Sequence, residues 1–433
     1  MVWKGCTKAC AGPYAGRVRA GTRQTSEWRS DAKRAAVLTY YHALQRLLQA
    51  IRPLAAERLP LTTASGRTLA TALVAPYPSP PFAQSLMDGY AVHSADTRSA
   101  TAEHPVRLRL GRTLTAGETL PQSLPAHQAI RIMTGAPLPA RADAVIKLED
   151  GDVYAHHLVI RAPLSPGVHI QKRGAEVRRH TVILPAGEIL TPQRIGCALS
   201  LGIDHAEVVR QPRIALVAPG DELLPPGAPL QPGKKWCSNL YALELRTQAL
   251  GAASINLGIV PDTLEALTAS LQRGLQGDVV VILGASGRGV HDFAARALAT
   301  LGAEILYRGV AMSPGRGITV AHYQHTLIFG LPGSPWAAFV GFEAFITPVV
   351  RALLGQRPLS IAHAALTTSV QVRRGVTHVM PTRLQSGTQG WEAVPLRDLL
   401  ALARAEGAPL ALLLVPPHRR QLPQGSRVRV QLL

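Results

Sequence analysis

The sequence predicts a multidomain protein that combines an α/β domain with two mostly β regions. The chain has 433 residues, which is too long for a single hydrophobic core. Short apolar runs alternate with amphipathic stretches from 213 to 354, a pattern typical of a three-layer α/β domain. Alternating apolar and polar residues dominate 82–162 and 361–433, which indicates half-buried strands. We interpret the last stretch as a small β-barrel or sandwich.

The chain begins with a basic segment, residues 1–30, that we expect to be a disordered extension. A helix is predicted over 31–52 from an apolar stripe at spacings of three and four: Val37, Leu38, Tyr41, Leu44, Leu48 and Ile51. Proline-rich residues 76–81 mark a boundary before the first β region. A further helix is predicted over 192–201. Residues 167–201 could pack on the first helix, which would make the β region an insertion.

The α/β region divides into strands, helices and loops. Strands are expected at 213–218, 254–259, 278–283, 303–310 and 326–329, and helices near 239–251, 262–275, 291–301 and 336–354. Loops are expected at 312–317 and 330–335. Because the loops that follow parallel strands meet at one edge of the sheet, we expect the ligand crevice at that edge.

A glycine-rich turn follows the most apolar strand, 278–283. Gly284, Gly287 and Gly289 stand between this strand and the next predicted helix. A strand, a glycine-rich turn and a helix in this order point backbone N–H groups at an anion, and Arg288 adds a fixed positive charge. The alternative is an ordinary turn in which glycines only permit positive φ angles. This stretch alone favours neither interpretation.

The net charge of +19 favours an anionic partner, either nucleic acid or a phosphorylated small molecule. The charge is dispersed except in the first thirty residues, no recognised nucleic-acid motif accompanies it, and aromatic residues are scarce. The composition therefore does not favour nucleic acid, and dispersed basicity is the simpler explanation.

Cysteine usage and hydropathy indicate the compartment. No run of eighteen or more apolar residues occurs, and the N-terminus lacks the apolar segment of a secretory signal. Four cysteines (Cys6, Cys10, Cys197 and Cys237) are too scattered for a disulfide framework and are interpreted as thiols. We therefore expect a cytoplasmic protein with no membrane span.

Five phrases are the main evidence for a family resemblance. They are SLMDGYAV (85–92), RIMTGAPLP…ADAVI (131–146), APGDELLPPG (218–227), GASGRGVHDF (284–293) and FGLPGSP (329–335), and LPLTTASGRTLA (59–70) precedes them. In this order and at these separations they resemble the MoeA family of molybdopterin molybdenumtransferases, a module that also forms the C-terminal part of gephyrin. The resemblance extends from residue 32 to residue 433.

The resemblance implies four domains after a basic extension (1–31). A discontinuous first domain would comprise 32–80 and 165–205, an inserted β domain 81–164, a three-layer α/β (MogA-like) molybdopterin-binding domain 206–355, and a C-terminal small β-barrel 356–433. It also implies an elongated homodimer. Its active site would lie between the α/β domain of one subunit and the inserted domain of the other.

The reaction implied is insertion of molybdate into adenylylated molybdopterin with release of AMP, in molybdenum cofactor biosynthesis. It would depend on a divalent cation, Mg²⁺, with molybdate and adenylylated molybdopterin as substrates. A MogA-type adenylyltransferase and apo-molybdoenzymes are the expected protein partners, and no membrane is expected.

Three carboxylates in glycine-flanked or loop positions suit this chemistry. Asp88, Glu222 and Asp292 are the candidate catalytic and metal-binding residues, because a hard cation at a phosphoanhydride prefers a few carboxylate oxygens. Taken singly, each of them could instead cap a turn. The candidate substrate-binding residues are Thr134, Asp143, Gly284, Ser286, Gly287, Arg288, Gly289, Pro314, Gly315, Arg316, Pro332, Gly333 and Ser334. Backbone donors and arginines in this set suit phosphate groups.

Several ligand-loop positions depart from the family pattern. Pro219 replaces a threonine, Gly287 a serine, Ser313 a lysine and Ser334 an asparagine. Each lost hydrogen bond is worth about 1–3 kcal/mol. A second hypothesis is therefore a catalytically degenerate paralogue that binds or carries the cofactor or acts as a scaffold. A third and weakest hypothesis is nucleic-acid association through residues 1–30.

Overall fold

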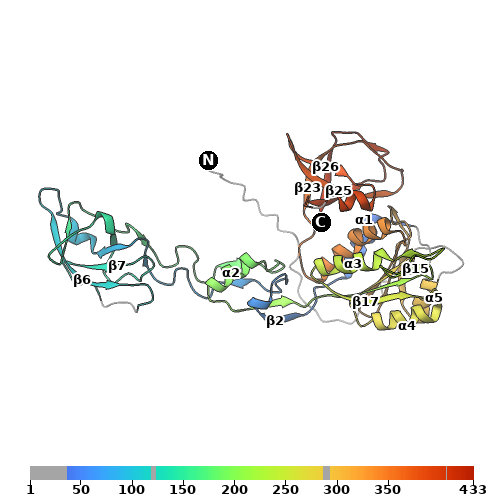
Figure 1. Ribbon diagram of the computed structural model, residues 1–433, viewed down its shortest axis with the longest axis horizontal. Coiled ribbons are helices and arrows are strands. Elements are labelled where there is room, and N and C mark those ends of the chain that lie inside the picture. The colour runs from blue at the N-terminus through green and yellow to red at the C-terminus, as the bar shows by residue number, and fades with distance from the viewer. Residues whose placement is uncertain (1–36, 119–122, 286–292, 406) are drawn as a thin grey trace.

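The computed structural model describes residues 37–118, 123–285, 293–405 and 407–433. It is an elongated molecule with the inserted β domain at one end, a narrow unit in the middle, and the α/β domain and barrel at the other end (Figure 1). The predicted combination of an α/β domain with an inserted β domain and a small C-terminal barrel is confirmed.

The α/β domain contains a sheet of six strands in the order β17-β14-β18-β22-β21-β19. The strands are β14 Arg213–Pro219, β17 Ala253–Val260, β18 Val279–Leu283, β19 Glu304–Arg308, β21 Thr319–Tyr323 and β22 Thr326–Leu331. The helices are α3 Ser238–Ala249, α4 Leu264–Gly274, α5 Phe293–Thr300, α6 Pro335–Gly341 and α7 Thr347–Leu353. Strands β17, β14, β18 and β22 are parallel to one another. Strand β21 is antiparallel to both of its neighbours, β22 and β19.

The central strands of this sheet are buried on both faces. In β14, Ile214 and Leu216 belong to the core formed with α3 and α7, whereas Ala215 and Val217 belong to the core formed with α4 and α5. A strand in the middle of three layers has no solvent-facing side and is therefore apolar at every position. This is why the unbroken apolar runs identified the buried strands correctly.

Helices α6 and α7 are continuous through a π-helical turn, Phe342–Ile346. The combined helix, Pro335–Leu353, is long and apolar enough to cross a membrane, but 78% of its most apolar window is buried inside the fold. Core helices of globular domains have both properties. Its position against the sheet identifies it as the central helix of the larger core.

One predicted strand, 303–310, is two strands of different sheets. The chain turns at Gly309, whose φ is +82°, and this turn separates β19 from β20 (Val310–Ser313). β20 pairs with β1 (Leu38–Thr39) and with β25 (Thr377–Gly387) of the barrel sheet. The prediction of a single strand was wrong because a strand that changes sheets keeps its apolar pattern. Strand β21 was not predicted.

Helix α1 spans Tyr40–Ala50 and packs on the core of the α/β domain. Its buried residues are Tyr40, Ala43 and Leu47, and the predicted Leu38, Leu44, Leu48 and Ile51 pack against the same core while partly buried, whereas Tyr41 is half exposed. Tyr40 points inward, where its hydroxyl donates to the carbonyl oxygen of Ala344 at 3.3 Å. Residues 31–36 of the predicted helix lie outside the described residues.

A narrow unit joins the two ends of the molecule. It contains β2 Ala56–Pro60, β3 Leu73–Val74, β12 Val182–Leu184, α2 Pro192–Ser200 and β13 His205–Val209. Strand β2 pairs with β13 and β3 pairs with β12, so segments on both sides of the inserted domain form one small core. The segment after the inserted domain, residues 182–209, packs on residues 56–74 rather than on α1.

The inserted domain is a sheet of six strands in the order β8-β5-β7-β6-β10-β9. These are β5 Gly89–Val92, β6 Val106–Leu114, β7 Gln128–Ile132, β8 Ala144–Lys147, β9 Asp152–Tyr154 and β10 His157–Ile160. Short strands β4 (Gln84–Ser85) and β11 (Ile170–Gln171) pair where the chain enters and leaves. Gly89 is the first residue of β5, which lies between β8 and β7 in this sheet. A methyl group there would lie 1.8 Å from the carbonyl oxygen of Ile146, so β8 can approach only a glycine.

The C-terminal domain is a closed barrel. Its strands are β23 Ile361–Leu366, β25 Thr377–Gly387, β26 Gly390–Pro395, β27 Leu410–Val415 and β29 Arg427–Leu432, with the short pair β24 Val370–Gln371 and β28 Gln421–Leu422 and the helix α8 Leu399–Ala403. The sheet closes because β27 pairs with both β29 and β25. Strand β20 extends this sheet and so joins the barrel to the α/β domain.

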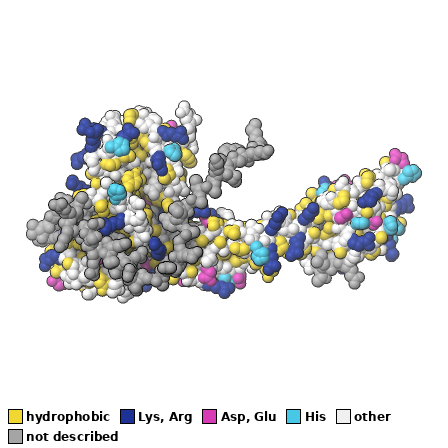
Figure 2. Space-filling model, turned by 180° about the vertical axis from the view of Figure 1, so that it is seen from behind, with side chains coloured by type: hydrophobic (Ala, Val, Ile, Leu, Met, Phe, Trp, Pro, Cys, Tyr) yellow, Lys and Arg dark blue, Asp and Glu magenta, His cyan; other side chains and the backbone are white. Residues whose placement is uncertain are grey.

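Lys and Arg side chains are distributed over the barrel, the middle unit and the inserted domain on the face drawn in Figure 2. This distribution agrees with the dispersed charge of the sequence. The basic block at the N-terminus lies outside the described residues, so the fold gives no support to nucleic-acid association through that block.

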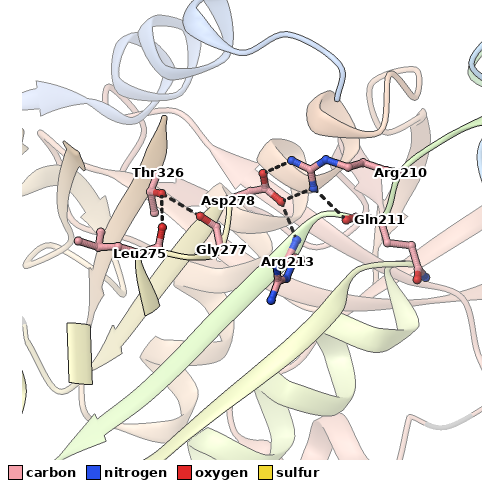
Figure 3. A network of polar contacts seen from close by, with 7 residues as sticks. All are labelled: Arg210, Gln211, Arg213, Leu275, Gly277, Asp278 and Thr326. Atoms are coloured by element: carbon pink, nitrogen blue, oxygen red, sulfur yellow. Dashed lines mark hydrogen bonds and ion pairs between the residues drawn. The ribbon is translucent and has the colours of Figure 1, made fainter. Parts of the chain in front are cut away.

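A polar network fixes the start of the α/β sheet (Figure 3). The carboxylate of Asp278 accepts two hydrogen bonds from the guanidinium of Arg210, at 2.6 and 2.9 Å, and one from the backbone N–H of Arg213 at 2.8 Å. Arg210 follows β13 of the middle unit, and Asp278 precedes β18. The network therefore ties the middle unit to the entrance of two parallel strands.

Replacing Asp278 with alanine is expected to lower the free energy of unfolding of the α/β domain by about 2 kcal/mol. The variant leaves the N–H of Arg213 and the guanidinium of Arg210 without their acceptor, and only 16% of the Asp278 side chain is exposed. Chemical denaturation followed by tryptophan fluorescence measures the change. Glu304→Ala is the control, since its ion pair with His322 lies on the exposed edge of the same sheet. Equal stability of the two variants would contradict the assignment.

Candidate functional site

Loops at the carboxyl ends of β14, β18 and β22 lie side by side, and the predicted crevice is the edge of the sheet that they form. The backbone N–H of Gly284, which follows β18, donates to the carbonyl of Leu331 at the end of β22 at 2.9 Å. A methyl group on Gly333 would lie 3.4 Å from the Cα of Gly284, and one on Gly284 would lie 3.8 Å from the carbonyl oxygen of Pro219. The structure therefore brings together the predicted residues that follow these three parallel strands, at the edge where ligands of open α/β sheets bind.

The start of helix α6 forms one wall of this crevice. Ser334 is the N-cap residue, and its hydroxyl accepts a hydrogen bond from the backbone N–H of Ala337 at 3.4 Å. The side-chain amide of Asn239, in the first turn of α3, donates to the carbonyl of Gly333 at 2.8 Å. Two helix N-termini thus adjoin the same loop, and helix N-termini favour negatively charged ligands. Asn239 was not among the predicted site residues.

Glu222 lies in the loop after β14, and Lys235 faces it. The ammonium of Lys235 lies 3.0 Å from Oε1 of Glu222, and 43% of the Glu222 side chain is exposed. Partial burial alone would raise the pKa of Glu222, but the hydrogen bond from Lys235 and the charges of Lys235 and Lys234 outweigh burial and hold the pKa below its usual value. Glu222 is therefore ionised at neutral pH, as a cation ligand must be.

The lysine reaches Glu222 because two very short strands pair beside it. β15 (Leu223–Leu224) and β16 (Lys235–Trp236) are parallel, and the N–H of Lys235 donates to the carbonyl of Glu222 at 2.8 Å. The sequence gives no sign of two-residue strands separated by a proline-rich excursion. The pairing of Glu222 with Lys235 was therefore not predictable from residue patterns.

The loop Pro314–Arg316 borders a second hollow, on the barrel side. A groove of about 510 Å³ is lined by Ser313, Pro314 and Trp336 of the α/β domain and by barrel residues that include Ser369, Gln371, His378 and Arg397. His378 accepts a hydrogen bond from the backbone N–H of Arg373 at 2.9 Å, and burial lowers its pKa. The imidazole is therefore neutral at pH 7. The barrel residues of this groove were not predicted.

In the inserted domain, Asp88 and Thr134 are in direct contact. The Oδ1 atom of Asp88 accepts hydrogen bonds from the backbone N–H and from the hydroxyl of Thr134, both at 2.7 Å. These two hydrogen bonds, together with the charge of Arg131, outweigh desolvation and lower the pKa of Asp88. The structure thus brings two predicted residues together, and Thr134 holds the exposed carboxylate of Asp88 in its ionised form.

The remaining predicted residues have other positions. Asp143 binds Ser94 with both carboxylate oxygens, to the backbone N–H at 2.6 Å and to the hydroxyl at 2.8 Å, which is the arrangement of a turn cap. Asp292, Ser286, Gly287, Arg288 and Gly289 lie outside the described residues. Among the residues that the structure describes, no group of three His, Cys, Asp or Glu side chains is arranged to hold a metal ion.

Within one chain, the inserted domain, to which Asp88 belongs, and the α/β domain, to which Glu222 belongs, lie at opposite ends of the molecule (Figure 1). The crevice therefore contains only part of the predicted residues. The fold and the crevice together define a multidomain protein whose α/β domain is suited to bind an anionic ligand at the carboxyl ends of its parallel strands.

The chain belongs to the MoeA family of molybdopterin molybdenumtransferases. Residues 38–202 match the MoeA N-terminal region (domain I and II), and residues 215–352 match a probable molybdopterin binding domain. Molybdopterin molybdenumtransferase 2 of Mycobacterium tuberculosis (strain H37Rv) is 34% identical over 78% of this chain and 85% of its own length. Molybdopterin molybdenumtransferase of Bacillus subtilis is 34% identical over 70% of this chain and 72% of its own length.

Solved structures agree with this assignment. The molybdopterin biosynthesis MoeA protein of Pyrococcus horikoshii superposes with a TM-score of 0.81 at 30% sequence identity, over 92% of this chain and 99% of that protein. The agreement extends over all four structural units, and the resemblance found in the sequence motifs is confirmed.

Proposed function

We propose that this protein is a cytoplasmic molybdopterin molybdenumtransferase that inserts molybdate into adenylylated molybdopterin and releases AMP. The observation that carries the proposal is the crevice, where the loops after three parallel strands and two helix N-termini converge beside an ionised Glu222. A phosphoanhydride with its negative charge suits such a crevice. The names of the relatives supply the molybdenum chemistry.

The carboxylates of Glu222 and Asp88 suit magnesium. A hard cation takes a few carboxylate oxygens and completes its shell with water and substrate phosphate. Glu222 is partly exposed and ionised, and Asp88 is exposed with one oxygen held by Thr134. Asp292 would be the third donor by resemblance. When bound, Mg²⁺ would supply Lewis acidity at the phosphate oxygens.

The chain itself would bind and orient the rest of the substrate. Backbone N–H groups near Gly284 and Gly333 would hold the phosphates, and Arg316, which is exposed, would add charge. The groove beside Pro314 would receive the pterin, with the indole of Trp336 as an apolar wall and the neutral His378 as a fixed hydrogen-bonding group. Pro314 and Trp336 both line this groove, and the helix that carries Trp336 begins next to Gly333.

The active site would be complete only in a homodimer. Asp88 and Glu222 lie at opposite ends of one chain, so an inserted domain from a second copy would have to supply Asp88. A MogA-type adenylyltransferase as the source of the substrate and apo-molybdoenzymes as recipients belong to the same proposal.

Chelation tests the proposal directly. Purified protein incubated with adenylylated molybdopterin, molybdate and magnesium is expected to release AMP and to reconstitute an apo-molybdoenzyme. Because Mg²⁺ would be needed at the anhydride, EDTA is expected to lower AMP release by at least roughly 100-fold, and excess Mg²⁺ to restore it. AMP is quantified by chromatography. Binding of the substrate without any AMP release would instead indicate the cofactor-carrying paralogue.

Mixing two inactive variants tests the shared site. Asp88→Asn and Glu222→Gln chains are dissociated, mixed in equal amounts and reassembled. About half of the dimers then contain one chain of each variant, and each of these dimers has one of its two sites intact. About a quarter of the wild-type activity is therefore expected to return. If both residues act within one chain, or if the protein is a monomer, mixing restores nothing.

A further inference from the structure

Trp236 is an exposed tryptophan on the segment that joins the Glu222 loop to helix α3. It ends β16, whose partner strand β15 follows Glu222 directly. Two residues later Ser238 opens α3, and the next residue, Asn239, binds the carbonyl of Gly333. The backbone on both sides of Trp236 is thus fixed to the loops that form the proposed phosphate site.

The indole ring is fixed in orientation yet exposed. Its Nε1–H donates to the carbonyl of Ala228 at 2.9 Å, so its single polar group is already satisfied within the chain. Half of the residue, 50%, remains exposed. A large aromatic surface that is held rigidly and left in water gains free energy when another planar ring covers it.

A second indole lies on the other side of the same loop. Trp336 follows Ser334 and Pro335 at the start of α6 and lines the groove toward the barrel. The N-termini of α3 and α6 are joined by the hydrogen bond from Asn239 to Gly333, so the two segments that carry the tryptophans both adjoin the loop at Gly333. A nucleotide joined through phosphates to a pterin has a planar ring at each end, and each of the two segments that adjoin Gly333 carries one tryptophan.

We infer that Trp236 is the surface on which the nucleotide base stacks, and that it determines selectivity for a nucleotide over a sugar phosphate. The inference rests on the proposed function, because it assigns one end of the proposed substrate. Trp336 serves the groove on the barrel side, which leaves Trp236 for the base. Stacking on an indole requires a planar ring but no particular base, so the selectivity is for the presence of a base.

Binding of AMP and of ribose 5-phosphate, each measured by calorimetry with magnesium present, separates the base from the phosphate. Trp236→Leu is expected to weaken AMP binding by roughly 5- to 150-fold, since it keeps an apolar side chain but removes the aromatic face. Its affinity for ribose 5-phosphate is expected to equal that of the wild type. Trp236→Phe is expected to retain most of the AMP affinity. Trp391→Leu, at a 46%-exposed tryptophan of the barrel, is the matched control and is expected to change neither ligand.

Each contrary result has a separate meaning. Unchanged AMP affinity in Trp236→Leu, with circular dichroism as in the wild type, overturns the stacking role and leaves the proposed function intact. Equal wild-type affinities for AMP and ribose 5-phosphate have the same consequence. If wild-type protein binds neither compound, the stacking inference fails together with the nucleotide part of the proposed function.

Discussion

Replacing Asp88 with asparagine is expected to lower AMP release by at least roughly 100-fold without changing the fold. The amide oxygen of asparagine can accept the same two hydrogen bonds from Thr134 that Oδ1 of Asp88 accepts. The loop therefore keeps its geometry, and only the negative charge is removed. Chromatographic AMP assays give the rate, and thermal melting by circular dichroism checks the fold.

The inserted domain offers a closely matched control for this variant. Glu118 is also exposed, and its Oε1 accepts hydrogen bonds from the backbone N–H and the hydroxyl of Thr115, at 3.2 and 2.8 Å. Hydrogen bonds from Thr115 lower its pKa, as Thr134 lowers that of Asp88. Glu118→Gln should therefore have the same local effect and leave AMP release unchanged. Wild-type turnover in Asp88→Asn would remove Asp88 from the mechanism.

The pKa of Asp88 also fixes how this effect depends on pH. The folded-state pKa is lowered, chiefly by the hydrogen bonds from Thr134. A carboxyl group with a lowered pKa stays charged above its ordinary value near 3.9 and loses its charge only as the pH falls through the lower, folded value. The ratio of wild-type to Asp88→Asn rates is therefore expected to stay constant from about pH 5 to pH 8. A ratio that declines within this range would contradict the ionised state.

Most of the α/β domain was predictable because its central strands are almost wholly apolar and its helices are amphipathic. The switch of the chain between two sheets at Gly309 was not predictable, since only this one residue separates β19 from β20. The full burial of Tyr40 in α1 was not predicted, because its hydroxyl binds the carbonyl of Ala344, which lies 304 residues away. The spacing of apolar residues along a short stretch of sequence carries no information on partners so distant in the chain.

The candidate site was predictable only in part, for the same reason. Residues that follow β14, β18 and β22 were located correctly because parallel strands end at one edge. The contact between Asp88 and Thr134 joins two motifs that were each singled out in the sequence. Lys235, Asn239, Trp236 and His378 were missed, because their roles depend on short strand pairs, on a helix start and on the barrel packing beside β20.

Glu343 gives the largest expected loss of stability. It lies in the π-helical turn between α6 and α7 and has no exposed side-chain surface. Its carboxylate accepts hydrogen bonds from Arg246 of α3 at 2.6 and 3.1 Å and from the hydroxyl of Thr347 at 2.8 Å. This ion pair fixes α3 against the central helix of the larger core.

Glu343→Ala is expected to lower the free energy of unfolding by about 3–5 kcal/mol, because Arg246 is left largely buried without a counter-ion and a cavity forms beside it. Urea denaturation followed by fluorescence measures the loss.

The pair itself need not stabilise the fold, since burying two charges costs solvation that their attraction only partly offsets. The double variant Arg246→Met, Glu343→Met is therefore expected to be more stable than Glu343→Ala, and a double-mutant cycle gives the coupling. If the double variant is as unstable as Glu343→Ala, the loss arises from packing rather than from an unpaired charge.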